Sequence, residues 1–123
     1  YQRVRPVSRH PQRREVDVIE AAKDVIARRF TDDLSLSDVA GEVRSSVFHL
    51  ARMFKARTGF TLRGYRNQLR LRSALDRLQD PATELIDIAL DLGFSSHSHF
   101  TETFRRTFGK TPSAVRDTLP ASP

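Results

Sequence analysis

Residues 96–109, SHSHFTETFRRTFG, combine side chains that can bind a metal, transfer protons or form hydrogen bonds with a polar surface. Two histidines and a glutamate in this order are compatible with a metal site, with general acid–base chemistry, or with a helix that contacts DNA. His97 and His99 would lie about 200° apart on an α-helix that turns about 100° per residue. Because an i, i+4 pair is needed to grip one ion from one helix face, we expect no metal and no cofactor here.

The overall charge of the chain favours a polyanionic partner. Its 123 residues are the size of one domain, or of two very small ones that share a connecting element. They hold 21 Lys and Arg against 15 Asp and Glu, a formal net charge of +6. Nucleic acid and an anionic membrane surface both fit this charge. The absence of cysteine excludes disulfides, thiolate zinc sites and thiol nucleophiles. No apolar run approaches the roughly 18 residues of a membrane span, so we expect a soluble intracellular protein without a membrane span.

The charge is sorted into blocks along the chain. Residues 1–14 hold five arginines and no acid, whereas residues 15–42 hold three basic and eight acidic residues. Residues 43–79 hold nine basic residues and one acid, and residues 80–104 hold five acids and no base. Such blocks indicate a face set against a charged partner, although a solvated face gives the same pattern. Residues 1–14, with two prolines and no apolar periodicity, are predicted to form a basic flexible arm or linker.

Helical periodicity dominates the rest of the chain, and the alternation typical of strands is absent. Seven helices are predicted, which makes the fold all-α: Asp17–Phe30, then residues 35–43, 46–57, 61–78, 83–92 and 96–108, and a short helix that starts at Thr111. Ser35 and Asp38 have the spacing of a capping box. The long helix is expected to turn Leu62, Tyr65, Leu69, Leu75 and Leu78 inward.

The opening stretch has a counterpart earlier in the chain. Ser46, Leu50, Phe54 and Gly59 match Ser96, Phe100, Phe104 and Gly109 at an offset of 50 residues, and Val39-Ala40 match Ile88-Ala89 at an offset of 49. Each unit is a short acidic helix, a tight turn and a second helix that ends at glycine. This is the pattern of a helix-turn-helix pair, whose second helix commonly enters the major groove of DNA.

Helical rotation separates two faces on the second helix of the first unit. Leu50, Met53 and Phe54 fall on the core side. The outward side holds Phe48, Ala51, Arg52 and Lys55. An aromatic ring among cations suits contact with a thymine methyl group or a sugar. Packing of Phe48 beneath the basic arm is the alternative.

The second unit follows the same register, which buries Phe100 and Phe104 and presents Ser98, Thr101, Glu102 and Arg105. His97 lies in the first helical turn, which usually approaches base edges. His99 corresponds to His49 at the flank of the face, where a phosphate contact and a hydrogen bond at the core edge fit equally well. With Ser46 and Ser96 at the helix starts, these positions of the two units are the candidate DNA-binding residues.

In order and spacing these segments resemble the AraC/XylS family of bacterial transcription regulators. The resemblance covers about residues 16–116 and rests on SSVFHLARMFKARTGFTLRGY, Arg70-Leu71 with Ala74, IDIALDLGFSSHSHF and FRRTFGKTPSAVR. It implies a double helix-turn-helix DNA-binding domain at residues 15–119, with a first unit at about 35–60, a connecting helix at about 61–79, a second unit at about 83–109 and a tail at 120–123. The implied contacts with double-stranded DNA are Phe48, Ala51 and Arg52 in the first unit and His97, Ser98, Thr101 and Glu102 in the second.

The resemblance also implies partners other than DNA, and no catalysis. It implies a cytoplasmic location on the nucleoid and no membrane partner. Family members commonly activate transcription by contacting RNA polymerase and commonly carry a separate sensing or dimerisation domain. Because the chain starts at Tyr1 with an arm typical of a linker, we expect such a domain on its N-terminal side. Because one chain holds two helices that could contact DNA, it could span two half-sites without forming a dimer.

Three positions depart from the family pattern. Arg44 stands where the family commonly has glycine, so a positive φ there would cost roughly 1 kcal/mol. Ala51 offers only apolar contact. Glu102 stands at the position of Arg52, where arginine is common, so it either accepts a hydrogen bond from a cytosine amino group or leaves the second unit as the weaker binder. The lack of basic residues in 80–104 favours the weaker second unit slightly.

Arg70 is the family-typical arginine of the connecting helix. We expect it to pair with an acid such as Asp87 and to fix the relation of the two units, and a contact with DNA is the alternative.

Three other functions compete with sequence-specific DNA binding. A non-specific nucleic-acid or anionic-surface binder, driven by the basic segments, would tolerate a scrambled target sequence. A domain that serves only protein interaction has Glu102 as its sole support. An enzyme that couples such a domain to DNA alkyl transfer would need a cysteine acceptor, which the chain lacks.

Overall fold

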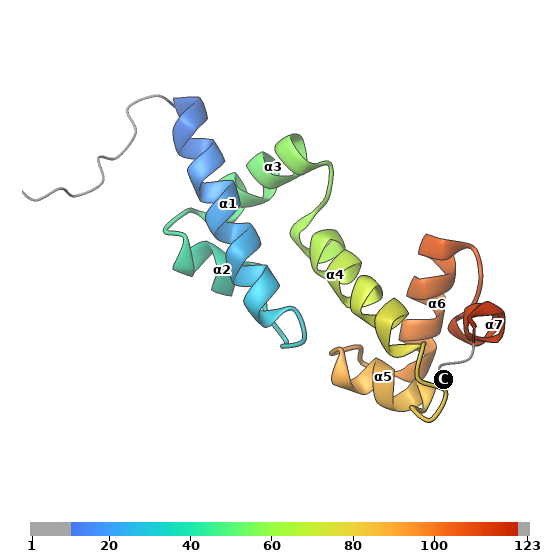
Figure 1. Cartoon of the computed structure of the whole chain (residues 1–123). Helices are drawn as coiled ribbons and strands as arrows, with labels where there is room; N and C mark the ends of the chain where they lie inside the picture. The colour runs from blue at the N-terminus through green and yellow to red at the C-terminus, as the bar shows by residue number, and fades with distance from the viewer. Residues whose placement is uncertain (1–10, 121–123) are drawn as a thin grey trace, which may run out of the picture. The chain divides into compact units, whose positions relative to one another are not determined.

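A computed structural model describes residues 11–120, which form seven α-helices (Figure 1). Their bounds are α1 Pro11–Arg29, α2 Leu36–Glu42, α3 Val47–Thr58, α4 Leu62–Arg77, α5 Leu85–Asp91, α6 His97–Phe108 and α7 Pro112–Thr118. No strand occurs within residues 11–120. The predicted all-α class with seven helices is confirmed.

The start of α1 corrects the sequence prediction. The helix begins at Pro11, ahead of the expected start at Asp17, so Arg13 and Arg14 are helical and do not belong to the arm. Proline suits a first helical turn because its missing N–H group would have no helical partner there. Glu15 then accepts from Arg57 of α3, with Oε1 3.0 Å from Nη2, which ties this early turn to the fold. The rest of the predicted arm, residues 1–10, lies outside the described residues.

The chain divides into two compact units, and α4 runs through both. The first unit holds α1, α2, α3 and the start of α4 through Tyr65. The second holds α4 from Arg66, then α5, α6 and α7, and also residues 30–33 of the loop after α1. Each unit is larger than the predicted helix-turn-helix pair because a pair alone leaves apolar surface uncovered.

The core of the first unit forms where α1, α2 and α3 pack against one another. One face of α1 is buried, at Ile19, Ala22, Val25 and Ile26. The core face of α3 lies at Leu50, Met53 and Phe54, which are 0%, 5% and 0% exposed, as the register predicts. Tyr65 of α4 stands edge-on to the Phe54 ring, with centroids 5.5 Å apart. Burial of three large side chains fixes the rotation of α3 and therefore its outward face.

The second core cluster joins α4, α5 and α6. Its buried members are Leu71, Ala74, Leu78, Ile88, Ala89, Leu92, Phe94, Phe100 and Phe104. In α4 the inward prediction holds for Leu62 and Leu78, whereas Tyr65, Leu69 and Leu75 are half-buried. The stripe of α4 in this core instead passes through Arg70, Leu71, Ala74 and Leu78, and includes a charged residue that is 2% exposed.

Candidate nucleic-acid interface

Helices α3 and α6, here called the reader helices, begin and end alike. The Ser46 hydroxyl oxygen accepts from the N–H of His49 at 3.1 Å, and that of Ser96 accepts from the N–H of His99 at 3.0 Å. Each helix ends at a glycine with φ 81°. Both serines therefore act as N-caps. Their hydroxyl hydrogens can still donate to a phosphate, so both stay candidate contacts.

A tight turn precedes each reader helix. The N–H of Ser45 donates to Ala40 at 3.0 Å in the first turn, and the N–H of Phe94 donates to Ala89 at 3.0 Å in the second. Arg44 does adopt a positive φ, 57°, so the strain cost expected for that case applies to the first turn. Each turn is therefore tied by main-chain hydrogen bonds to the short helix that precedes it.

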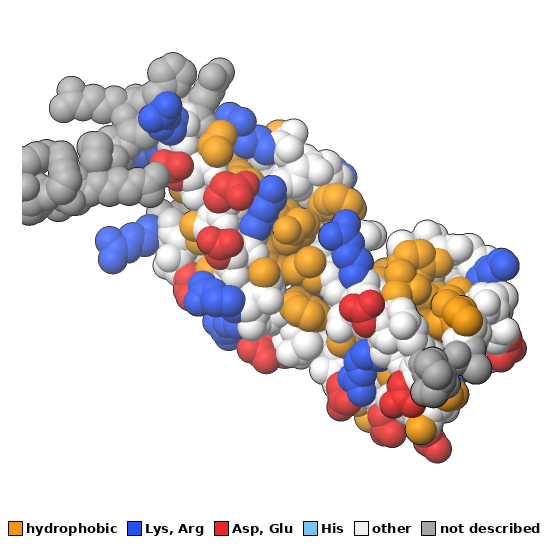
Figure 2. Space-filling view, in the orientation of Figure 1, with side chains coloured by type: hydrophobic (Ala, Val, Ile, Leu, Met, Phe, Trp, Pro, Cys, Tyr) orange, Lys and Arg blue, Asp and Glu red, His pale blue; other side chains and the backbone are white. Residues whose placement is uncertain are grey.

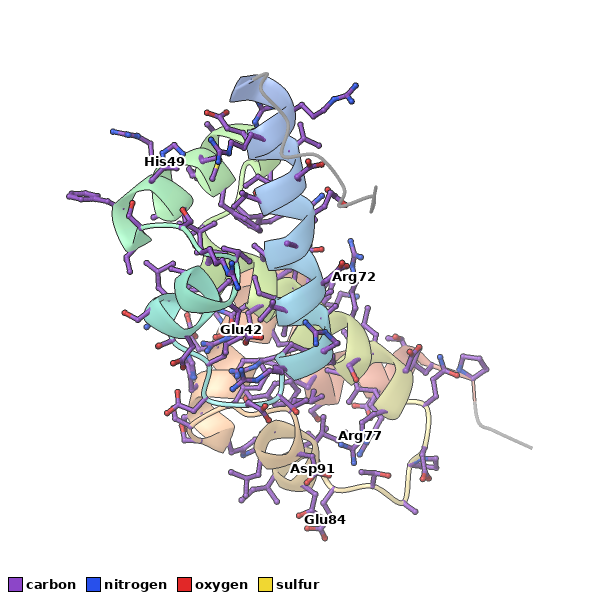
Figure 3. The ribbon with its side chains drawn as sticks, turned by 90° about the vertical axis from the view of Figure 1, so that its left-hand side faces the viewer. Glu42, His49, Arg72, Arg77, Glu84 and Asp91 are labelled. Atoms are coloured by element: carbon purple, nitrogen blue, oxygen red, sulfur yellow. The ribbon has the colours of Figure 1, made fainter. Side chains whose placement is uncertain are left out.

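The outward face of α3 matches the predicted register. Phe48 is 85% exposed, and Arg52, Lys55 and His49 are exposed, the last marked in Figure 3. Ala51 is half-buried at the edge of this face. Because nothing in residues 11–120 covers the Phe48 ring, it is open to an apolar contact. The Lys55 ammonium donates to the carbonyl of Gly59 at 2.9 Å, at the C-terminus of the helix.

The outward face of α6 also follows prediction. His97, Ser98, Glu102 and Arg105 are exposed, and Thr101 is half-buried. The buried side includes Thr103, 9% exposed, which the sequence analysis did not identify. Thr103 is the counterpart of buried Met53 at the offset of 50, so the repeat could have predicted its burial.

Glu102 lies within an ion-pair cluster on α6. The Arg105 Nη2 donates to both carboxylate oxygens, at 2.9 and 3.0 Å, and the Arg106 Nη2 lies 3.5 Å from Oε1. The hydrogen bonds and positive charge of Arg105, with a smaller effect of Arg106, hold the pKa of Glu102 below its usual value. Arg106 was not among the predicted site residues. Its i, i+4 spacing from Glu102 could have identified it.

The two histidines of α6 have different surroundings. His99 Nδ1 lies 3.4 Å from the Ser95 hydroxyl, and the His99 ring stands edge-on to Phe94 with centroids 5.5 Å apart. This contact favours the core-edge role of His99 over a phosphate contact. His97 is exposed in the first turn. Within the described range, no three His, Cys, Asp or Glu side chains are grouped to hold a metal ion.

Arg70 does not make the contact predicted for it. Its Nε donates to the carbonyl of Phe30 at 2.6 Å and its Nη2 to that of Asp32 at 3.0 Å, so the expected pairing with Asp87 is wrong. The guanidinium also lies over the Phe94 ring, 5.4 Å from its centroid. Burial lowers the pKa of Arg70 to about 10, so it remains a cation at neutral pH. Arg70 therefore holds residues 30–33 within the second unit.

Other cations of the basic segment, residues 43–79, also form ion pairs inside their own unit. Arg57 pairs with Glu15, and Arg77 of α4 pairs with Asp91 of α5 at 3.0 Å (Figure 3). Arg63 and Arg72 are exposed on α4. Acidic side chains gather over α5 in Figure 2, in agreement with the acidic block at 80–104. The positive charge open to a polyanion is therefore smaller than the sequence count suggests.

Comparisons with known proteins agree with this arrangement. A family model described as a helix-turn-helix domain matches residues 39–118. The regulatory protein PocR of Salmonella typhimurium is 35% identical over 94 residues, which cover 76% of this chain and 31% of PocR. The HTH-type transcriptional activator RhaS of Escherichia coli is 37% identical over 87 residues, 71% of this chain and 31% of RhaS. The chain thus spans less than a third of the length of these relatives.

A solved structure extends the likeness to three dimensions. A transcriptional regulator from Chromobacterium violaceum, described as having an AraC-type DNA-binding domain, is similar with a TM-score of 0.77 and 31% identity. The match covers 86% of this chain and 96% of that one. None of the helices in residues 11–120 combines the length and apolar character needed to cross a bilayer. The chain belongs to the AraC/XylS family of transcription regulators, a non-enzymatic family, and contains its helix-turn-helix DNA-binding domain.

Proposed function

We propose that the domain recognises specific double-stranded DNA sequences by placing α3 and α6 in the major groove. The observation that carries this proposal is the repeated presentation of the two helices. Each is capped by serine and buried on one side. The other side is exposed and mostly polar, with Phe48 as a large apolar member on α3. A helix with one polar face fits the major groove, which is about 12 Å wide.

The exposed side chains divide into two roles. Arg52 and Lys55 suit phosphate or guanine contacts, while the Phe48 ring suits a thymine methyl group. On α6, His97 and Ser98 lie in the first turn, nearest to where base edges would be. Phosphate contacts would supply most of the affinity and make it fall with salt, whereas the base contacts would supply specificity.

The proposal extends to partners beyond DNA. RhaS is described as a transcriptional activator, and this chain matches only 31% of its length. We infer that the domain acts together with a sensing or dimerisation domain and regulates transcription by contacting RNA polymerase. Its site of action would be the cytoplasm, on the nucleoid.

Selection from randomised duplexes tests the proposal. The chain should enrich a defined motif, and a scrambled version of that motif should bind at least about 100-fold more weakly. Phe48→Ala should weaken binding to the selected duplex by about 10-fold with little effect on the scrambled one. Arg28→Ala, which removes an exposed cation from α1, is the control and should change both affinities equally. Equal affinity for selected and scrambled duplexes would instead support the non-specific binder.

A further inference from the structure

The outward face of α6 carries a closed cluster of charges, which we define as Glu102, Arg105 and Arg106. Glu102 Oε1 lies 2.9 Å from Arg105 Nη2 and 3.5 Å from Arg106 Nη2. The side chains are 48%, 54% and 73% exposed, so all three can reach a partner. Because they stand on one helix at i, i+3 and i+4, the geometry depends on α6 alone.

The equivalent face of α3 is built differently. At the offset of 50 residues, Glu102 corresponds to Arg52, Arg105 to Lys55, and Arg106 to an alanine. Arg52 is exposed and forms no ion pair with any residue in the range 11–120. The first reader helix therefore presents a cation directly, whereas the second presents cations already held by a carboxylate.

We propose that Glu102 competes with DNA phosphate for Arg105 and Arg106. A carboxylate and a phosphate accept hydrogen bonds from a guanidinium in the same way, so one can replace the other. Exposed ion pairs are weak, which allows the exchange to occur on binding. Until it occurs, two of the cations of α6 are withheld from the polyanion.

The competition has a consequence for specificity. Phosphate contacts supply the sequence-independent part of DNA affinity, and each one steepens the dependence on salt. Holding Arg105 and Arg106 back lowers this part, so α6 binds well only where the base contacts of the same helix compensate. Glu102 thereby lowers the sequence-independent affinity of α6 and makes its binding depend more on the base contacts. This role deepens the proposed function and rests on it.

Glu102→Gln tests the inference by fluorescence anisotropy on a duplex of random sequence. At about 0.1 M salt the variant should bind about 3- to 10-fold more tightly, and its salt slope should steepen by about one to two. Glu20→Gln is the matched control, because Glu20 forms an i, i+3 pair with Lys23 at 3.1 Å on α1. It changes the net charge equally and should alter affinity less than about 2-fold.

A double-mutant cycle separates competition from simple repulsion of phosphate by the carboxylate. In a chain with Arg105→Gln and Arg106→Gln, the Glu102→Gln change should tighten binding by less than about 1.5-fold. A full gain in that background would overturn the proposal in favour of repulsion. Weaker binding by Glu102→Gln in the native background would also overturn it, because the carboxylate would then contact a base.

The random duplex keeps this test independent of the proposed function. If no motif is enriched in the selection, sequence-specific recognition fails, yet the Glu102 cycle still reports on phosphate competition. If a motif is enriched but Glu102→Gln behaves like Glu20→Gln, the competition fails and the specific function stands.

Discussion

The turns that precede α3 and α6 begin alike but carry different residues at the same point, and the second is one residue longer. In both, a residue with positive φ follows the short helix: Arg44 at 57° in the first unit and Gly93 at 96° in the second. The N–H of each donates back to the short helix, at 3.3 Å to Gly41 and at 3.1 Å to Leu90. The turn itself therefore accepts arginine, at the cost of a left-handed conformation.

What differs is the packing around the two turns. Arg44 is exposed. A Cβ atom on Gly93 would clash with the carbonyl oxygen of Thr31 and lie 2.8 Å from the Arg70 Nη2. The second turn thus needs glycine for space as well as for its backbone conformation. The loop at residues 30–33 and the Arg70 side chain therefore require glycine at position 93.

The largest effect is expected from Gly93→Ala, which should lower the free energy of unfolding by about 3 kcal/mol, through backbone strain and overpacking together. Urea unfolding followed by circular dichroism measures it. Gly41→Ala is the matched control, because a Cβ there meets nothing within 4 Å, and alanine should stabilise α2 by about 0.5 kcal/mol. A loss below about 1 kcal/mol for Gly93→Ala would refute close packing at this turn.

Arg70→Met tests the other partner in the packing around Gly93. It removes the donors to the Phe30 and Asp32 carbonyls and should cost about 2–3 kcal/mol of stability. The salt slope of DNA binding, measured well below the melting temperature, should stay unchanged. A variant of native stability with a salt slope shallower by about one would show that Arg70 contacts phosphate.

Arg44→Gly should make the first turn resemble the second. Removing the side chain relieves the left-handed strain but adds freedom to the unfolded chain, so a net gain of about 0.5–1 kcal/mol is expected. Thermal unfolding of Arg44→Gly and Arg44→Ala distinguishes the causes, since alanine keeps the strain. Equal melting temperatures for the two variants would show that backbone strain at position 44 does not lower stability.

The smallest effect concerns the starts of α2 and α5. Ser35 and Asp38 form a capping box, with both hydrogen bonds at 3.0 Å, and the Ser35 N–H holds the pKa of Asp38 below its usual value. At the same position α5 has Glu84, which makes no side-chain cap, although Asp87 already stands at N3. Glu84→Ser should therefore complete a second box and add about 0.5 kcal/mol, seen as a higher melting temperature. An unchanged or lower melting temperature would contradict this reading of α5.

Much of the fold followed from the sequence because its signals are local. Serine caps, terminal glycines and the register of Leu50 and Phe100 each depend on residues within a few positions. The partner of Arg70 could not be predicted in this way. Its acceptors are main-chain carbonyls 38 and 40 residues away, and a carbonyl has no residue type that marks it. An acid such as Asp87 was the natural expectation for a cation.

The candidate site was predictable to a different degree. The outward faces of the reader helices followed from helical rotation, as the exposure of Phe48 illustrates. The ion pairs of Glu102 were not predicted, because Glu102 was compared with Arg52 as a DNA contact and not with its neighbours on α6. Arg105 and Arg106, three and four residues after Glu102, are the groups that pair with its carboxylate.

Backbone amide NMR of the chain, titrated with a selected duplex, shows which residues contact DNA. The largest shifts should fall on residues 46–55 and 96–106, at the caps and outward faces of α3 and α6, while the amides of α1 and α5 move little. Shifts confined to residues 1–14, or spread evenly over the basic segment, would contradict recognition by the two reader helices.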